Sequence, residues 1–186
     1  MPKIVEIADT PNPNAKKFTL DEPLSWGETY SFENVKEAKD NALAAALFDI
    51  EDITNVFYVD HWLTVTKSDE ADWLELVSKV SELIIAAPAA EQLLTATEVE
   101  KTTAIPGLNS VDQHRFDNIC ILIDEQIRPA LQGDGGDLSV VGLDGNQLSV
   151  HYQGACGSCP SALSGTLRGI EGLVKTIEPN IEVVAV

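Results

Sequence analysis

Two hydrophobic periodicities alternate along the first half of this chain of 186 residues. Apolar residues at helical spacing run from Trp73 to Ala87, and a capping-box pattern at Asn34–Glu37 opens an earlier helix through Ala42–Phe48. Short alternating runs predict four strands: Lys17–Leu20, Thr29–Phe32, Thr54–Val59 and Trp62–Thr66. The predicted order of this half is β-β-α-β-β-α.

The second half follows a different order. An apolar stripe from Phe116 to Leu131 predicts a helix, and a hairpin turn at Asp144–Asn146 joins two alternating strands. A second helix runs from Leu163 to Ile177, and a last strand covers Ile181–Val186. The predicted order is α-β-β-α-β.

The pattern decays between these halves, where Pro88 and Ile105-Pro106-Gly107 interrupt it. We therefore predict an α+β protein of two small domains, 1–90 and 111–186, joined by a linker over 91–110.

Charge restricts the possible partners. The formal net charge is −18, and residues 1–100 alone carry 7 lysines and 20 acidic residues, a net charge of −13. A surface with this much negative charge repels nucleic-acid phosphates and anionic lipids. We therefore expect neither nucleic acid nor a membrane surface as partner. No apolar run has the length of a membrane span.

Two features indicate a cytoplasmic location. Met1-Pro2-Lys3 opens neither a signal peptide nor an Arg- and Ser-rich transit peptide. Three cysteines, an odd number, do not suggest a secreted disulfide scaffold. In a reducing compartment, a Cys-x-x-Cys pair points to metal or redox chemistry.

The segment Cys156-Gly157-Ser158-Cys159-Pro160 is the strongest candidate for chemistry. It lies between a strand and a helix, and the partial positive charge of a helix start favours thiolates. Gly154 and Ala155 precede it, and such small residues should leave both sulfurs uncovered.

Other polar residues fit plainer roles. Cys120 lies on the apolar stripe of a helix and should pack in the core. Gly133–Asp137 reads as a helix stop with a tight turn needing positive φ, although it could also shape a partner surface. His151 is five residues before Cys156 and could be a third ligand, but an exposed strand histidine is the commoner case.

The residues alone leave three interpretations of the thiol pair open. It can cycle between dithiol and disulfide, as in a thioredoxin-like oxidoreductase, although an antiparallel hairpin replaces the βαβ unit of that fold. It can bind zinc, which needs two further ligands. Two chains can also meet at their cysteine pairs and hold one iron–sulfur cluster with four thiolates.

Three C-terminal motifs together resemble the C-terminal domain of NifU and its Nfu relatives. They are Ile127-Arg128-Pro129-Ala130-Leu131-Gln132-x-Asp134-Gly135-Gly136-Asp137, Gly154-Ala155-Cys156-x-x-Cys159-Pro160-Ser161 and Thr166-Leu167-x-Gly169-Ile170-Glu171. The opening Asp9-Thr10-Pro11-Asn12-Pro13-Asn14-Ala15-x-Lys17-Phe18 is similar to the N-terminal domain of the Nfu proteins.

This resemblance implies an iron–sulfur cluster scaffold or carrier, not an enzyme. It implies that Cys156 and Cys159 bind a [4Fe–4S] cluster between two subunits, with [2Fe–2S] as the other type that takes four thiolates. The cluster would pass to apo iron–sulfur proteins from a homodimer. The acidic first domain carries no candidate ligand, and we expect it to bind client proteins or upstream assembly factors.

Overall fold

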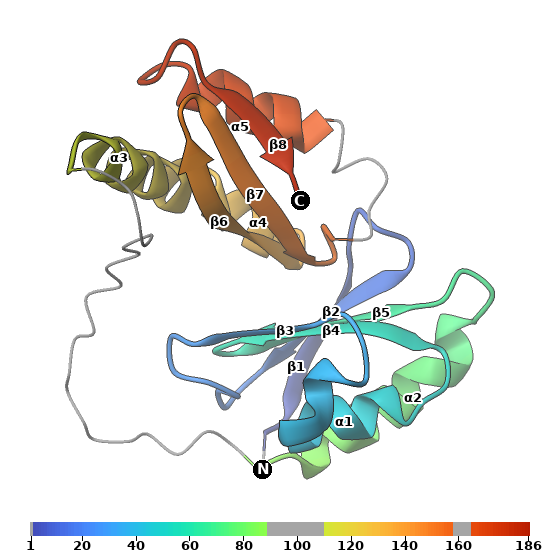
Figure 1. Ribbon diagram of the computed structural model, residues 1–186. Coiled ribbons are helices and arrows are strands. Elements are labelled where there is room, and N and C mark those ends of the chain that lie inside the picture. The colour runs from blue at the N-terminus through green and yellow to red at the C-terminus, as the bar shows by residue number, and fades with distance from the viewer. Residues whose placement is uncertain (1, 89–109, 158–164) are drawn as a thin grey trace.

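The structure is a computed structural model, which describes residues 2–88, 110–157 and 165–186. The described chain forms two sheets, each with its own helices and its own apolar core (Figure 1). The α+β class is therefore confirmed. None of the helices in these ranges has the length and apolar character needed to cross a membrane.

The first sheet is antiparallel, with the strand order β1-β2-β5-β4-β3. Its strands are β1 (Ile4–Asp9), β2 (Ala15–Leu20), β3 (Thr29–Phe32), β4 (Ile53–Val59) and β5 (Trp62–Lys67). The helices α1 (Ala42–Phe48) and α2 (Trp73–Ala86) cover one face, and the second domain lies on the other side (Figure 1).

Alternation along the strands separates these two faces. Phe18, Leu63 and Val65 belong to the core beneath the helices, where they meet Leu76 and Val80 of α2. The alternate residues of the same strands, described below, face the second domain.

The prediction from sequence lacked β1. This strand pairs with β2 at the edge of the sheet, and its apolar Val5 and Ile7 are exposed. An edge strand gains its place from backbone pairing, so its side-chain pattern gives little signal.

The first helix also begins later than its capping pattern suggests. A 3-10 turn η1 occupies Glu37–Asp40, and α1 starts at Ala42. Asn41 is its N-cap, because the Asn41 side chain accepts a hydrogen bond of 2.9 Å from the Ala44 N–H.

Among the described residues of the second domain, three helices pack against the sheet β6-β7-β8. Its elements are α3 (Ser110–Gln126), α4 (Arg128–Gly133), β6 (Gly136–Asp144), β7 (Gln147–Gly154), α5 (Leu167–Val174) and β8 (Glu182–Ala185). One predicted helix is thus two, since Pro129 lies in the first turn of α4 and fits a helix start better than a helix interior.

Strand direction in this sheet is mixed. β6 and β7 form the predicted antiparallel hairpin, and Gly145 adopts φ 57° in its turn. β8 returns parallel to β7, with α5 in the crossover. The hairpin begins at Gly136 and ends at Gly154, and the turn that contains Cys156 follows directly.

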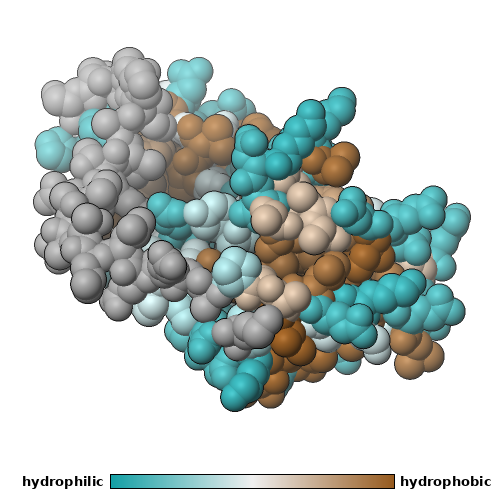
Figure 2. Space-filling view, turned by 90° about the horizontal axis from the view of Figure 1, so that it is seen from below, coloured by the Kyte–Doolittle hydropathy of each residue, from teal (hydrophilic) through white to brown (hydrophobic). Residues whose placement is uncertain are grey.

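Seen from the side of α1 and α2, hydrophilic groups lie around areas of exposed apolar surface (Figure 2). On α2, Leu74 and Ile85 are exposed.

Candidate functional site

Cys156 lies in a tight turn directly after β7. We call Gly154–Gly157 the cysteine turn. The Gly157 N–H donates to the Gly154 carbonyl at 3.1 Å, and Gly154 adopts φ 61°. The Ala155 N–H donates to the Gly135 carbonyl at 3.1 Å. The turn is thereby fastened to the start of β6.

Gly136 provides the surface on which Cys156 rests. It is paired with Gly154 across the β6–β7 hairpin. A Cβ atom added to Gly136 would lie 2.4 Å from the Cys156 Sγ and 2.9 Å from its backbone nitrogen. The position of the thiol therefore requires glycine at 136.

This support buries Cys156, whose residue is 6% exposed and belongs to the core of the second domain. The expectation that small neighbours leave the sulfur uncovered is wrong for Cys156 in this structure. Cys159, with Pro160 and Ser161, lies outside the described residues.

Gly133–Asp137 is the helix stop predicted from sequence. α4 ends at Gly133, and Gly135 adopts φ 79°. The same segment supplies the backbone beside Cys156, so the turn also shapes the candidate site.

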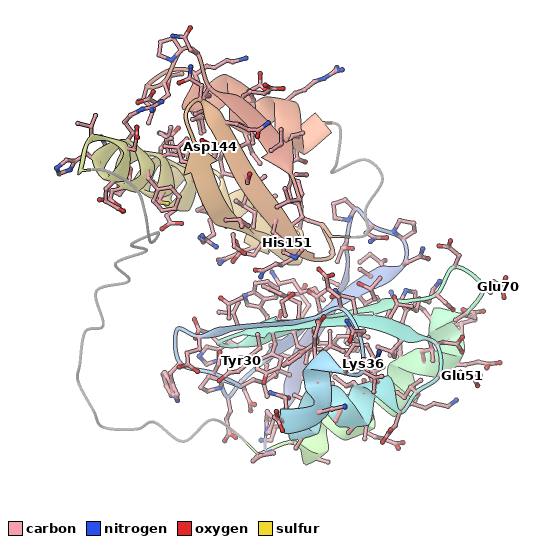
Figure 3. All side chains as sticks on the ribbon, in the orientation of Figure 1. Tyr30, Lys36, Glu51, Glu70, Asp144 and His151 are labelled. Atoms are coloured by element: carbon pink, nitrogen blue, oxygen red, sulfur yellow. The ribbon has the colours of Figure 1, made fainter. Side chains whose placement is uncertain are left out.

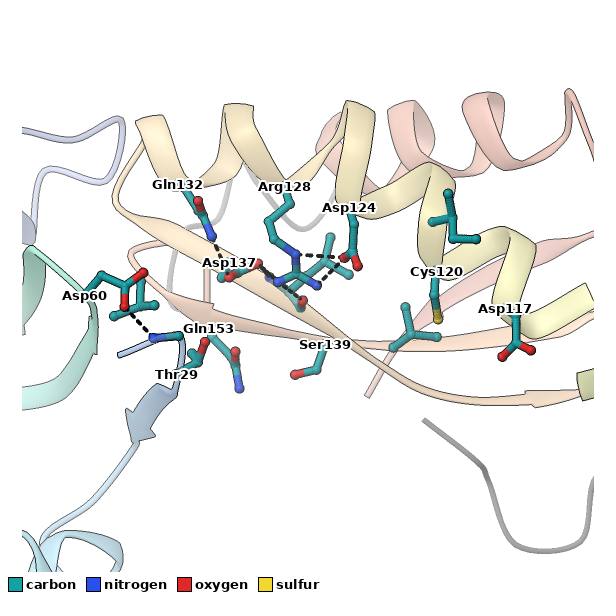
Figure 4. A pocket seen from close by; sticks show the side chains of 15 residues that line it. Thr29, Asp60, Asp117, Cys120, Asp124, Arg128, Gln132, Asp137, Ser139 and Gln153 are labelled. Atoms are coloured by element: carbon teal, nitrogen blue, oxygen red, sulfur yellow. Dashed lines mark hydrogen bonds and ion pairs between the residues drawn. The ribbon is translucent and has the colours of Figure 1, made fainter. Parts of the chain in front are cut away.

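A buried carboxylate fixes this segment to α4 (Figure 4). Asp137 is 1% exposed and forms an ion pair with Arg128. Gln132 donates to its Oδ2 at 3.2 Å, and the Leu138 N–H donates to its Oδ1 at 2.7 Å. Arg128 also pairs with Asp124 at 2.7 Å. A buried charge needs such partners, so the network holds β6 in register beside the cysteine turn.

Neither Cys120 nor Tyr152 supplies an ionised metal-binding group to the cysteine turn. Cys120 packs partly buried against the core, as predicted, and burial with the charges of Asp124 and Asp117 raises its pKa to about 11. Burial, with a smaller contribution from Cys156, raises the pKa of Tyr152 to about 12. Both side chains are therefore neutral at neutral pH.

Both ring nitrogens of His151 lie against protein oxygen atoms. It lies on β7 on the side of the first domain (Figure 3). Its Nε2 is 2.9 Å from Glu33 Oε1, and its Nδ1 is 2.8 Å from the Val186 carbonyl oxygen. Within the described ranges, no group of three or more His, Cys, Asp or Glu residues could hold a metal ion.

A cavity of about 1030 Å³ lies between the domains. Residues of the first domain, including Thr29 and Asp60, line one side, and Cys120, Arg128 and Gln153 line the other (Figure 4). No local pattern in the sequence indicates this cavity, because its walls come from segments that are far apart in the chain.

Two family descriptions match the chain. "Scaffold protein Nfu/NifU N terminal" matches residues 5–91, and "NifU-like domain" matches residues 119–185. A human protein named NFU1 iron-sulfur cluster scaffold homolog, mitochondrial, is 32% identical and aligns with 96% of this chain and 69% of its own length. The chain belongs to the Nfu/NifU family of iron–sulfur cluster scaffold proteins.

Other relatives of this Nfu-family chain are longer. The homolog of the same name from Drosophila willistoni is 30% identical, covering 96% of this chain but 61% of the fly protein. NifU-like protein 5, mitochondrial, of Arabidopsis thaliana is 29% identical, covering 91% of this chain and 62% of the plant protein. The chain thus spans about three fifths of these two relatives. A crystal structure of protein SAV1430 from Staphylococcus aureus is 27% identical over 44% of this chain and 98% of its own, with a TM-score of 0.40.

Replacing Gly136 by alanine in this Nfu-family chain should displace Cys156. The methyl group has no room beside Sγ, so we expect a loss of about 2 kcal/mol in unfolding free energy and faster alkylation of the thiol. Urea unfolding followed by circular dichroism and alkylation rates measure both effects. Gly142→Ala is the matched control on the same strand, because nothing lies within 4 Å of a Cβ there. Equal behaviour of the two variants would contradict the supporting role of Gly136.

Asp137→Asn should destabilise the second domain by about 3 kcal/mol, because Arg128 loses its buried counter-charge. Asp124→Asn removes the other carboxylate on the same guanidinium, but Asp124 is 56% exposed. That variant should cost less than about 1 kcal/mol. Urea unfolding of both variants compares them, and a larger loss at position 124 would overturn this ranking.

Proposed function

We propose that this chain binds an iron–sulfur cluster of the [4Fe–4S] type through Cys156 and Cys159 and delivers it to apo-proteins. Each of two chains contributes its cysteine pair, so that four thiolates hold the cluster. The cluster is cargo, and the chain is a carrier without catalytic turnover. Membership of a scaffold family is the observation that carries this proposal.

The position of the cysteines supports it. Both lie within the segment that matches the NifU-like domain, residues 119–185. Cys156 lies in a turn at the end of a hairpin, and the described residues around it provide no set of three metal-binding side chains. A cysteine pair without further ligands suits a cluster completed by a second copy, since a two-fold axis brings the same patch together.

Delivery follows from thiolate exchange. An incoming client thiolate forms a bond to iron while the bond from that iron to Cys156 or Cys159 breaks. The released thiolate takes up the proton that the client thiol gave up, and no electron is transferred. A cluster between two chains can be released in such steps without unfolding either domain.

The fold argues against the oxidoreductase alternative. In a thioredoxin-like protein, a βαβ unit leads into the cysteine pair. Here the antiparallel hairpin of β6 and β7 leads into Cys156. The topology that leads into the cysteine turn therefore differs from that of a thioredoxin-like protein.

The first domain is proposed to bind clients or upstream assembly factors. Its acidity, a net charge of −13 over residues 1–100, is the motivating observation. Removing residues 1–100 should slow delivery to a client with a basic surface. Unchanged transfer rates to every client tested would count against this role.

Cys156→Ser and Cys159→Ser should each lower the bound iron at least about tenfold, because serine is a poor ligand for iron–sulfur clusters. Cys120→Ser is the control, since Cys120 packs against the core of the second domain. Anaerobic reconstitution with ferrous iron and sulfide, followed by iron content, visible absorption and mass, makes the comparison.

Wild type and Cys120→Ser should contain about four irons per two chains and run as dimers. A stoichiometric cluster in either serine variant at 156 or 159 would refute the ligand assignment. Wild type that stays monomeric without iron, yet reduces disulfides, would establish the oxidoreductase instead.

A further inference from the structure

The centre of the helix-free face of the first sheet is buried, although no helix among the described residues of its own domain covers it. Strand register places Lys17, Thr64, Phe57 and Ser31 in one row across β2, β5, β4 and β3. Phe57 and Thr64 are both 0% exposed. Phe57 lies outside the core beneath the helices, and its ring packs against Trp62 with the centroids 5.2 Å apart and the planes tilted by 42°.

The cysteine turn and its support occupy this face. A Cβ added to Gly154 would lie 3.0 Å from Cγ of Phe57. One added to Gly135 would lie 3.0 Å from Oγ1 of Thr64. Both glycines thus let the backbone of the second domain lie directly on the first sheet.

Two hydrogen bonds tie the same surfaces together. Asn12 Nδ2 donates to the Ala155 carbonyl at 3.0 Å, and this bond is buried. Lys17 Nζ donates to the Gln132 carbonyl at 2.6 Å. Asn12 thus reaches the residue before Cys156, and Lys17 reaches the end of α4.

Other polar atoms on this face are buried without a partner in the described structure: Ser31 Oγ, Asn55 Oδ1, Thr64 Oγ1 and Thr66 Oγ1. Register places all four on the helix-free side. Burying polar atoms without hydrogen bonds opposes the closed arrangement, because water would satisfy them if the domains parted. The contact therefore has specific anchors but a weak centre, as a reversible contact needs.

We propose that the helix-free face of the first domain is a docking surface for the cysteine turn, occupied in the cluster-free chain by its own turn. Docking braces the turn in which Cys156 is buried against its own domain, and it covers the backbone that a second chain must approach. The contact thus competes with the two-chain cluster arrangement, a consequence that rests on the proposed function. Loading requires the turn to leave this surface.

Alkylation of Cys156 in the full cluster-free chain tests the docking directly. Cys120→Ser and Cys159→Ser in the background leave Cys156 as the only thiol. Asn12→Asp keeps the Oδ1 that accepts from the Asn14 N–H at 3.0 Å, but places oxygen against the Ala155 carbonyl. We expect iodoacetamide to react with Cys156 about tenfold faster in this variant than in the same background with Asn12. The variant loses one buried hydrogen bond and gains repulsion between the new carboxylate and the Ala155 carbonyl.

Lys17→Met removes the second anchor while keeping the apolar stem, and it should raise the rate independently. Asn34→Asp is the matched control, because it makes the same charge change in the first domain and its hydrogen bonds stay within 34–37. Small-angle scattering should show a larger radius of gyration for Asn12→Asp and Lys17→Met than for Asn34→Asp.

Equal alkylation rates and equal dimensions in all three variants would overturn the docking. The test uses no iron, so its result is separable from the proposed function. If Asn12→Asp exposes the thiol while wild type never takes up a cluster, docking stands and the carrier function fails. If wild type loads a cluster but the anchor variants alter neither reactivity nor dimensions, the carrier function stands and docking fails.

Discussion

The contact between the Cys156 sulfur and the backbone of Gly136 is the constraint on which the rest of the site depends. A hairpin strand can carry a thiol this close to its neighbour only if the neighbour lacks a side chain. The Asp137 network then fixes the strand, and Gly154 turns the chain back over it. The turn that carries Cys156 is thus held by backbone contacts and by the ion pair of the buried Asp137 with Arg128.

The lack of side chains at glycine positions also explains how the two domains meet at the cysteine turn. Gly135 and Gly154 present bare backbone to the first sheet, so Asn12 can reach a carbonyl beside the thiol. Contacts to bare backbone bury little apolar surface, which suits a contact that must form and break. A side-chain interface of similar area would bury more apolar surface and would separate less readily.

The sequence predicted the class, most of the elements and the hairpin before Cys156, because strand alternation and turn residues are local signals. It did not predict β1, whose pairing at a sheet edge depends on its neighbour β2. It also missed the break at Pro129, although a proline within a helical pattern is a local signal for such a break. Asn12 was visible only as part of a resemblance. Its partner Ala155 is 143 positions away, and nothing in the chain between them indicates the contact. Cys159 keeps its predicted role without a structural test.

All three tryptophans, Trp26, Trp62 and Trp73, belong to the first domain. Trp62 lies on the helix-free face, with the Lys17 ammonium 4.7 Å from its ring centroid. Its fluorescence therefore reports on a cation that also bonds to the second domain, whereas the cores of the two domains share no residue. The chain carries an intrinsic optical probe of whether its halves are coupled, and the cooperativity of their unfolding can be read without attaching a label.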